Sequence, residues 1–234
     1  MIEVKTTLYC PHCFATKIVR NGHKKNKIQN YLCRNCGKQF QHENLYRGCQ
    51  TDTKQLLIKM LVNGNGIRDI GNILAVSLGY VLRTLLRVGE CIQIKPARRH
   101  YHRVQIDELY SFVGHKQKKV WILYAYCAET DEILAMTACK RGAKQIKDRL
   151  KGLEGITVDW WCKDAWSAFK EVLPYYEHLI GKRFTKAIEG VNTSLRNTCK
   201  RLHRRTTSFS KKVRNHWFAL KMVVHHRNGN LSYN

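Results

Sequence analysis

Two closely spaced cysteine pairs constrain the amino-terminal part of the chain more than any other feature. Cys10 and Cys13 form one C-x-x-C pair, Cys33 and Cys36 form the other, and nineteen residues separate the pairs. Four thiolates complete the tetrahedral shell of one structural Zn²⁺, and the two intervening residues let each backbone turn around the ion. We therefore predict a zinc ribbon over residues 1–48, which is too small to hold a core without the metal.

The remaining cysteines argue against a disulfide framework. Six of the ten cysteines are scattered along the chain. A redox role is the alternative for a single C-x-x-C pair, but two matched pairs favour zinc. A reducing compartment fits this cysteine usage best.

The charge balance points to a polyanionic partner. Lys and Arg number 42 against 17 Asp and Glu, which gives a formal net charge of +25. So large an excess destabilises the folded state through self-repulsion, and binding to nucleic acid explains it. A merely basic or ribosome-associated protein is the alternative. We find no stretch apolar enough to span a membrane and no signal peptide, so we expect a cytoplasmic, nucleoid-associated prokaryotic protein with no membrane partner.

Residues 49–95 are predicted to form a helical helix-turn-helix DNA-binding domain. A first apolar stripe ends at a break over residues 63–66, a short second stripe follows, and Ser77 is the N-cap of a third helix. A three-helix bundle or a dimerisation element is the alternative. On the third helix we expect an inward set of Leu78, Val81, Leu82, Leu85 and Leu86. We expect an outward set of Tyr80, Arg83, Thr84 and Arg87.

Residues 96–234 are predicted to form an α/β catalytic domain. Three strands come first, followed by a helix, a fourth strand, a short helix and two longer helices, which is the order of an RNase H-like fold. The predicted elements lie at residues 103–112, 119–128, 132–139, 143–153, 155–162, 167–172, 186–202 and 211–226.

Three carboxylates occupy the positions that two-metal phosphoryl transfer requires in such a fold. One must lie on the first strand, one just beyond the fourth strand and one on a later helix, so that they converge on two Mg²⁺ or Mn²⁺ ions. Asp107, Asp164 and Glu189 meet these demands. Rivals for the first two positions are Glu108, which points to the opposite face of its strand, Asp131 and Asp159.

Glu189 is the most informative of the three carboxylates. Between Lys182 and Arg227 it is the single acid among 13 Lys and Arg residues. The alternative is that Glu189 only pairs with a nearby cation, Lys182, Arg183 or Lys186. The surrounding basic and polar surface is predicted to contact DNA. We predict DNA contacts for Tyr80, Arg83, Arg87, Asn192, Arg196, Arg201, Arg204 and Arg205.

Taken together, these motifs resemble transposases of the insertion-sequence-one family over nearly the whole chain. The matching features are the two cysteine pairs, the helix-turn-helix, Ile106-Asp107-Glu108, Phe112-Val113-Gly114, Trp121-Ile122-Leu123-Tyr124-Ala125-Tyr126, Asp164-Ala165-Trp166, Arg183-Phe184-Thr185, Ile188-Glu189, Asn192, Leu195-Arg196, Arg201-Leu202 and Ser208-Phe209-Ser210-Lys211. Gly190-Val191 departs from the family pattern, in which a more polar pair follows the glutamate.

The resemblance implies a Mg²⁺-dependent DDE transposase with an RNase H-like catalytic domain. Such an enzyme binds the terminal inverted repeats of an insertion sequence, cleaves at the element end and transfers the freed 3′-hydroxyl into target DNA. Because both ends must be held together, we expect a homodimer or a higher oligomer on DNA. A transposon-encoded transcriptional repressor and a structure-specific metal-dependent nuclease are the alternatives.

Overall fold

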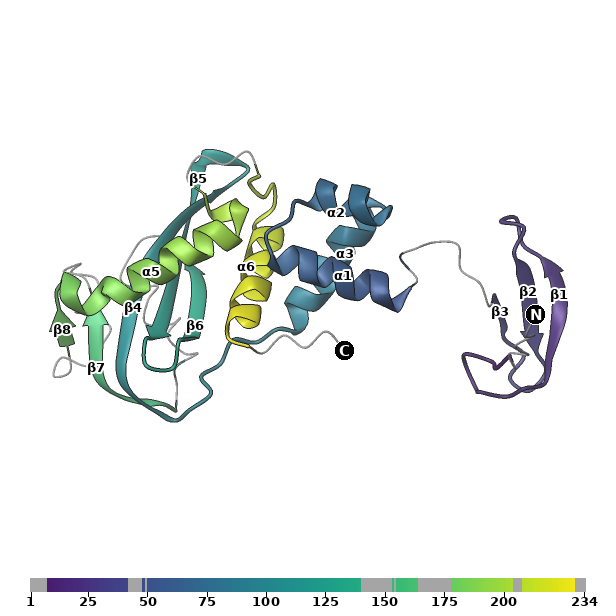
Figure 1. The fold of residues 1–234 in the computed structure, drawn as a ribbon, viewed down its shortest axis with the longest axis horizontal. Helices are drawn as coiled ribbons and strands as arrows, with labels where there is room; N and C mark the ends of the chain where they lie inside the picture. Colours follow the sequence, from purple (N-terminus) through teal and green to yellow (C-terminus); the bar gives the residue numbers. More distant parts are fainter. Residues whose placement is uncertain are drawn as a thin grey trace, which may run out of the picture. The chain divides into compact units, whose positions relative to one another are not determined.

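The computed structural model forms two compact units, Met1–Thr53 and Lys54–Asn234 (Figure 1). The structure describes residues 8–41, 48, 50–139, 153, 155–163, 178–203 and 208–229. The predicted helices at 143–153 and 167–172 lie outside these residues, apart from Leu153. The three-domain division at residues 48 and 95 stays a prediction.

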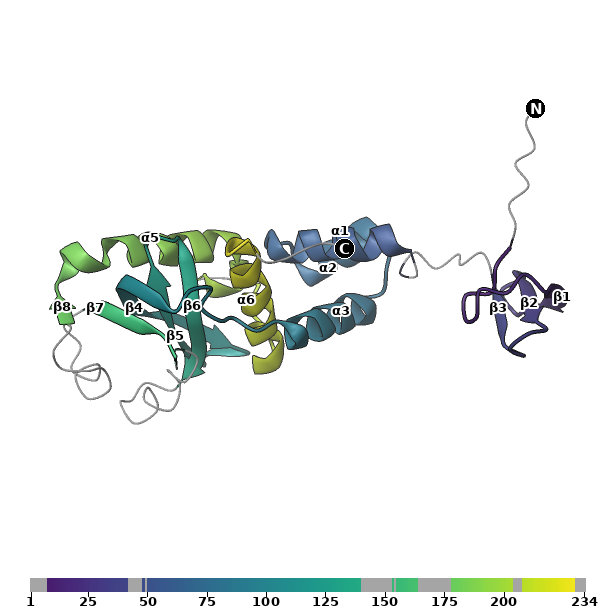
Figure 2. The ribbon, with the colours of Figure 1, turned by 90° about the horizontal axis from the view of Figure 1, so that it is seen from below.

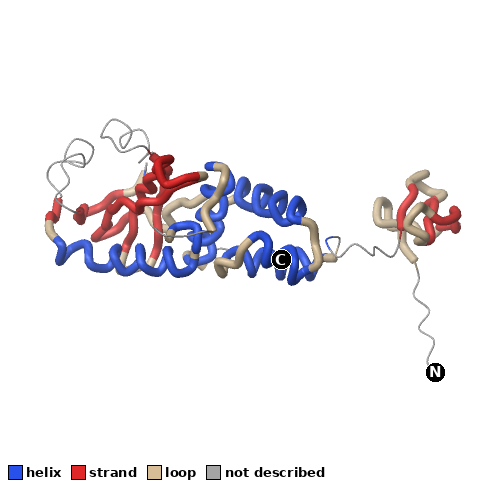
Figure 3. The backbone as a smooth tube through the Cα atoms, turned by 90° about the horizontal axis from the view of Figure 1, so that it is seen from above, coloured by secondary structure: helices blue, strands red, loops and turns tan. Residues whose placement is uncertain are grey.

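The first unit holds a three-stranded antiparallel sheet in the order β1-β2-β3, drawn in red within the smaller unit of Figure 3. Its strands are β1 (Ile18–His23), β2 (Gln29–Cys33) and β3 (Gln39–Gln41). Among the described residues, its buried apolar cluster is small and consists of Cys10, Cys33 and Phe40. Because two of these three are cysteines, the core of this unit is built around the cysteine cluster.

Three helices open the second unit. They are α1 (Thr51–Val62), α2 (Ile67–Leu74) and α3 (Leu78–Cys91). The predicted N-cap is confirmed, since the Ser77 side chain accepts a hydrogen bond from the backbone N–H of Tyr80 at 3.2 Å. Ala75 adopts a left-handed conformation between α2 and α3, and the two helices meet at 117°.

The buried face of α3 differs from the prediction at three residues. Thr84 is buried, Tyr80 is half-buried, and Leu78 is 45% exposed. The carboxyl-terminal helix α6 (Val213–Arg227) packs along α3, a contact between distant segments that the pattern of α3 alone does not indicate. At Gly89 a β-carbon would lie only 2.4 Å from the Cβ of Phe218, so the two helices approach closely there.

A mixed five-stranded sheet forms the centre of the second unit, in the order β6-β5-β4-β7-β8. The strands are β4 (His100–Val113), β5 (His115–Cys127), β6 (Glu132–Cys139), β7 (Thr157–Lys163) and β8 (His178–Ile180). β4, β5 and β6 pair antiparallel, whereas β7 and β8 run parallel to β4. The four predicted strands are confirmed. The three-residue β8 was not predicted, because it is too short to show an alternating pattern.

Two helices cover one face of this sheet. They are α5 (Lys182–Thr198) and α6, and Figure 2 shows α5 lying along the sheet. A 3₁₀ turn at Lys200–Leu202 follows α5. The core beneath them includes Leu109, Tyr124, Ile188 and Leu220. The opposite face carries a separate apolar cluster. The predicted mixed α/β architecture is confirmed.

Among the described residues, no single helix is long and apolar enough to cross a membrane. The bent pair α2 and α3 meets those criteria only when its two helices are taken together.

Candidate functional site

The four predicted zinc ligands lie together in the first unit. The Sγ atoms of Cys10, Cys13, Cys33 and Cys36 are all within 4.8 Å of one another. Two of the Sγ–Sγ distances, Cys10 to Cys36 and Cys13 to Cys33, are 3.7 and 3.6 Å. A tetrahedral ion with Zn–S bonds of about 2.3 Å places its sulfurs about 3.8 Å apart. The cluster therefore fits one zinc ion, and these distances are too long for disulfides.

The backbone around the cysteines supports thiolate ligands. Each knuckle closes with a similar turn, in which the N–H of Phe14 or Gly37 donates to the carbonyl of Cys10 or Cys33 at 2.9 Å. The backbone N–H of Cys36 lowers the pKa of Cys33 to about 7. At Cys13 the backbone N–H of Ala15 also lowers the pKa of the thiol. Burial and the neighbouring thiols outweigh it and raise the pKa of Cys13 to about 12. Four crowded thiols are difficult to ionise together without a cation, which is the role that zinc fills.

In the second unit, Asp107 lies midway along the central strand β4. Its Oδ1 accepts a hydrogen bond from the backbone N–H of Glu108 at 2.7 Å. Its Oδ2 accepts one from the side-chain Nδ2 of Asn192, on α5, at 2.6 Å. The side chain is half-buried. Asp107 is therefore held on the sheet face that α5 covers.

Tyr124 on the neighbouring strand β5 fixes the orientation of Asn192. Asp107 and Tyr124 are directly paired in the sheet. The Tyr124 hydroxyl donates to Asn192 Oδ1 at 2.8 Å and approaches the Ile188 carbonyl at 3.3 Å. Because Asn192 Oδ1 accepts from Tyr124, its Nδ2 faces Asp107. Burial, reinforced by the charge of Asp107, raises the pKa of Tyr124, so the hydroxyl stays a donor.

Further contacts attach α5 to the sheet. The backbone N–H of Gly181, before the helix, donates to the carbonyl of Lys163 at the end of β7 at 3.3 Å. The N–H of Ile188 donates to Gln105 Oε1 on β4 at 2.8 Å. These contacts fix the helix at both the β7 end and the Asp107 region of the sheet.

Glu189 is exposed on α5, one turn before Asn192. Residues three apart on a helix are neighbours on its surface, so Glu189 lies beside the group that holds Asp107. Lys182, Arg183 and Lys186 are all described, and none of them forms an ion pair with Glu189. The alternative that Glu189 only pairs with one of them finds no support among the described residues.

Asp164 lies outside the described residues. The last described residue of β7 is Lys163, which pairs with Ile106, the residue before Asp107. Lys163 also pairs with Ile180 of β8, shortly before α5 begins. The end of β7 and the start of α5 therefore meet beside the strand that carries Asp107.

The rival carboxylates have other surroundings. Asp131 bonds to Arg227 and Tyr126, and the Arg227 guanidinium lowers its pKa although burial acts in the other direction. Asp159 accepts a hydrogen bond from His102 at 2.8 Å, which lowers its pKa. Glu108 is the strand neighbour of Asp107 and lies on the opposite face of β4. The hydrogen bonds of Asp131 and Asp159 do not involve Asp107 or α5.

Comparison with known proteins identifies the family. The family model for IS1 transposase matches residues 103–228, and the InsA N-terminal domain model matches residues 4–37. The chain belongs to the IS1 transposase family. The sequence-based recognition is therefore confirmed, and the ribbon match agrees with the cysteine cluster.

Individual relatives of this transposase come from bacteria. The insertion element iso-IS1n protein InsB of Shigella dysenteriae is 37% identical over 112 residues, which cover 48% of this chain and 86% of the relative. The insertion element IS1 protein InsB of Shigella flexneri is 32% identical over 124 residues, which cover 53% of this chain and 92% of the relative. Among solved structures, a chain of the simian T-cell lymphotropic virus intasome in complex with PP2A regulatory subunit B56 gamma aligns over 72% of this chain and 64% of that one. Its identity is 12% and its TM-score 0.38, too low to support a shared fold.

The predicted DNA-contact residues of the transposase have different environments. Arg83 and Arg87 are exposed on α3. Arg196 donates to the carbonyl of Leu202 at 3.2 Å, and Arg201 donates to Ser210 Oγ at 2.6 Å. Arg204 and Arg205 lie outside the described residues. All of these DNA contacts stay predictions, and the intramolecular hydrogen bonds of Arg196 and Arg201 give those two a structural role as well.

Tyr124 and Gln105 are parts of the site that were not predicted from the sequence. Gln105 lies two residues before Asp107, so strand alternation places it on the same face, and a polar residue there was an available signal. Tyr124 lies in an apolar strand whose aromatic residues suggest only core packing. Its role follows from the strand register and the position of α5, neither of which the sequence displays.

Proposed function

We propose that this transposase is a DDE enzyme that cleaves the ends of an insertion sequence and joins them to target DNA. The observation that carries the proposal is the 2.6 Å hydrogen bond from Asn192 to Asp107. It links the central strand to the helix that bears Glu189. In this proposal the sheet, with its three antiparallel and two parallel strands, and α5 form an RNase H-like catalytic domain.

Asp107, Asp164 and Glu189 are the proposed ligands of two Mg²⁺ or Mn²⁺ ions. Their carboxylate oxygens are the donors that these cations prefer. The hydrogen bonds from Glu108 to Oδ1 and from Asn192 to Oδ2 hold the Asp107 carboxylate in a fixed orientation. When bound, the two ions activate the attacking oxygen and neutralise charge at the scissile phosphate.

The protein side chains orient this chemistry. Asn192 holds the Asp107 carboxylate, and Tyr124 holds Asn192, so the first ligand is fixed before any cation binds. The exposed cations at the start of α5, Lys182, Arg183 and Lys186, attract the DNA backbone to the helix that carries Glu189. Water at the element end and then the freed 3′-hydroxyl are the proposed nucleophiles, and neither step needs a covalent protein–DNA bond.

The DNA-reading role is assigned to the two amino-terminal modules. We propose that α2 and α3 form a helix-turn-helix, with Arg83 and Arg87 on its outer surface, and that it binds the inverted repeats together with the ribbon. Because two element ends must react together, the active species is at least a dimer.

A joining assay tests the proposal. Labelled inverted-repeat DNA, a target plasmid and Mg²⁺ are incubated with wild-type protein and with Asp107→Asn, Asp164→Asn and Glu189→Gln. We expect joined products from the wild type and a loss of at least about a thousandfold in each variant, because each removes a metal ligand. Asp159→Asn is the matched control and should retain activity.

The outcomes separate the candidate functions. Full joining by any of the three variants would overturn the site assignment. Sequence-specific binding without cleavage by the wild type would favour a repressor. Cleavage without joining would favour a structure-specific nuclease.

A further inference from the structure

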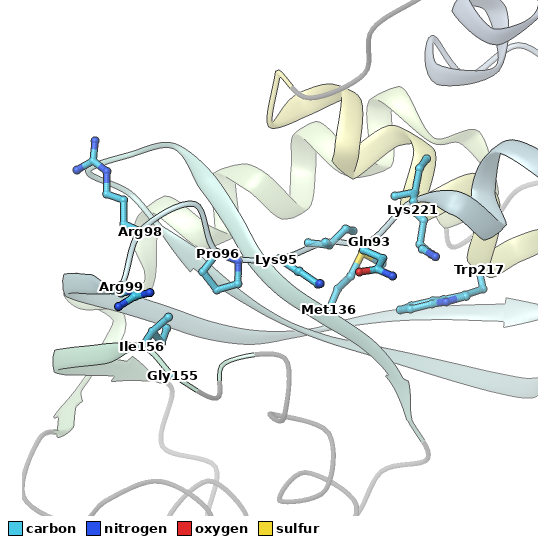
Figure 4. A pocket seen from close by; sticks show the side chains of 12 residues that line it. Gln93, Lys95, Pro96, Arg98, Arg99, Met136, Gly155, Ile156, Trp217 and Lys221 are labelled. Carbon is cyan, nitrogen blue, oxygen red and sulfur yellow. The ribbon is translucent and has the colours of Figure 1, made fainter.

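A pocket of about 700 Å³ lies beside the edge strand β6 of the second unit, and its lining residue Met136 is paired with Tyr124 of β5. The segment between α3 and β4 forms one wall, and α6 and β6 form the other (Figure 4). Its lining residues are Ile92, Gln93, Ile94, Lys95, Pro96, Arg98, Arg99, Met136, Gly155, Ile156, Trp217 and Lys221. None of them contributes to the hydrogen bonds that hold Asp107, so the pocket is a separate feature.

The charge of the pocket is entirely positive. Lys95, Arg98, Arg99 and Lys221 line it, and no acidic residue is among its lining residues. Within the described part of the chain, none of these four cations forms an ion pair. Lys95, Arg98 and Arg99 are exposed, and a cluster of one sign of charge at a concave surface attracts an anion.

Lys221 differs from these three exposed cations. Its side chain is half-buried, and burial lowers its pKa because the charged form loses water. Cys91 and Glu90 act in the opposite direction, and the Lys221 Nζ lies 5.3 Å from the centre of the Phe218 ring, while the Glu90 carboxylate is paired with Arg214 at 3.0 Å. An anion in the pocket would add a full opposite charge beside Lys221.

The pocket also offers a flat apolar surface. Figure 4 shows the Trp217 ring beside Met136, with Gln93 and Lys221 near them and Lys95 toward Pro96. Arg99 and Ile156 lie at the other end, and Arg98 points away from the rest. Trp217 is only partly buried, so part of the indole remains accessible. Cations around an accessible indole are the combination that binds a nucleotide, with phosphate on the cations and base on the ring.

We propose that this pocket binds an unpaired nucleotide of a DNA strand, with its base against Trp217 and Met136 and its phosphates beside Lys95, Arg99 and Lys221. The volume lies within the range of small-ligand sites and accommodates a base with its sugar. The choice of DNA as the polyanion rests on the proposed function. The pocket thereby gives the transposase a site for unpaired DNA in addition to its carboxylates.

Binding without chemistry tests the proposal. The full-length, zinc-loaded protein is titrated, with no added Mg²⁺, into a labelled single-stranded oligonucleotide and into the same strand paired as a duplex. Trp217→Ala should weaken single-strand binding by about tenfold, the effect of losing one stacked base. Duplex binding should change by less than about twofold, because paired bases cannot enter the pocket. Trp160→Ala, which removes an exposed indole elsewhere on the sheet, is the matched control and should leave both affinities unchanged.

A second variant covers the case in which Trp217→Ala disturbs folding. Lys95 is exposed, so Lys95→Glu should fold normally and weaken single-strand binding more than Lys118→Glu, an exposed lysine on β5. Equal effects of the two lysine variants, or unchanged single-strand binding by a folded Trp217→Ala, would overturn the proposal. Displacement of the oligonucleotide by poly-glutamate at equal charge would overturn it in favour of an acidic protein partner.

The test is independent of catalysis. Asp107→Asn should bind the single strand as the wild type does, since the pocket residues are unchanged. A failed joining assay with intact pocket binding therefore counts against the proposed function alone. Normal joining, together with single-strand binding that does not change when the pocket residues are substituted, counts against the nucleotide site alone.

Discussion

At the residue scale, the orientation of Asp107 depends on a hydroxyl that touches neither metal nor DNA in the proposed site. Tyr124 donates to Asn192, and Asn192 donates to Asp107. Tyr124→Phe removes the first donor and leaves Asn192 free to rotate. We expect a loss of about 1 kcal/mol in the free energy of unfolding. We also expect the Mg²⁺ concentration for half-maximal cleavage to rise by about tenfold, as for other groups that orient metal ligands.

The Mg²⁺ dependence distinguishes orientation from simple destabilisation. Tyr126→Phe is the control, because its hydroxyl donates to Asp131 at 2.7 Å, outside the site. That variant should lose stability but keep the wild-type Mg²⁺ dependence. The same Mg²⁺ response in both variants would show that Tyr124 has only a packing role.

The burial of His216 predicts that the stability of the folded protein depends on pH. It is buried on α6, neither ring nitrogen has a hydrogen-bond partner among the described residues, and burial with the nearby charge of Arg201 lowers its pKa to about 4. The unfolded chain takes up a proton at this histidine below about pH 6.5, whereas the folded chain does so only near pH 4. The free energy of unfolding should therefore fall by up to about 3 kcal/mol as the pH drops through this window. His216 should contribute no pH dependence above pH 7.

Urea unfolding followed by the helical circular dichroism signal measures this effect. His216→Phe should unfold at nearly the same urea concentration at pH 7 and pH 4.5, apart from the change that other groups contribute. Substitution of the exposed His203 by Gln should leave the wild-type difference in place. If His216→Phe keeps the full wild-type difference, the buried ring is not its source.

At the element scale, a glycine next to Glu189 lowers the stability of helix α5. Gly190 follows Glu189 in the helix interior, and a β-carbon built there meets no atom within 4 Å. Gly190→Ala should stabilise the protein by about 0.5–1 kcal/mol, because alanine loses less backbone freedom in a helix. Thermal denaturation should show a rise of about 1–4 °C. Gly89→Ala is the opposing control, since its β-carbon would collide with Phe218 and lower the melting temperature.

The long elements of the second unit were predictable from the sequence, whereas some contacts between them were not. Long strands and helices carry a clear hydrophobic period, so β4 to β7, α5 and α6 were predictable to within a few residues. Thr84 was predicted to be exposed from the pattern of α3 alone, which carries no information on the packing of α6, more than a hundred residues later in the chain. Asp107 and Glu189 could be chosen from position and charge, whereas the hydroxyl of Tyr124 gains its role only through contacts between distant segments.

At the scale of the whole molecule, the two units depend on different sources of stability. The second unit has continuous apolar cores on and around its sheet, whereas the buried apolar cluster among the described residues of the first holds only Cys10, Cys33 and Phe40. A core of that size cannot offset the conformational entropy of folding without a metal. Zinc removal should therefore unfold the ribbon and leave the second unit folded.

Chelator titration tests this separation. As zinc leaves, limited proteolysis should cut within residues 8–41 while a fragment beginning near Lys54 persists, because that residue opens the second compact unit. The helical signal should remain, since the described helices lie almost wholly in that unit. Cys13→Ser should reproduce the protease-sensitive state without chelator, and chelator should then add little. A helical signal that fell in step with zinc release would mean that the ribbon also stabilises the second unit, contrary to the separate cores.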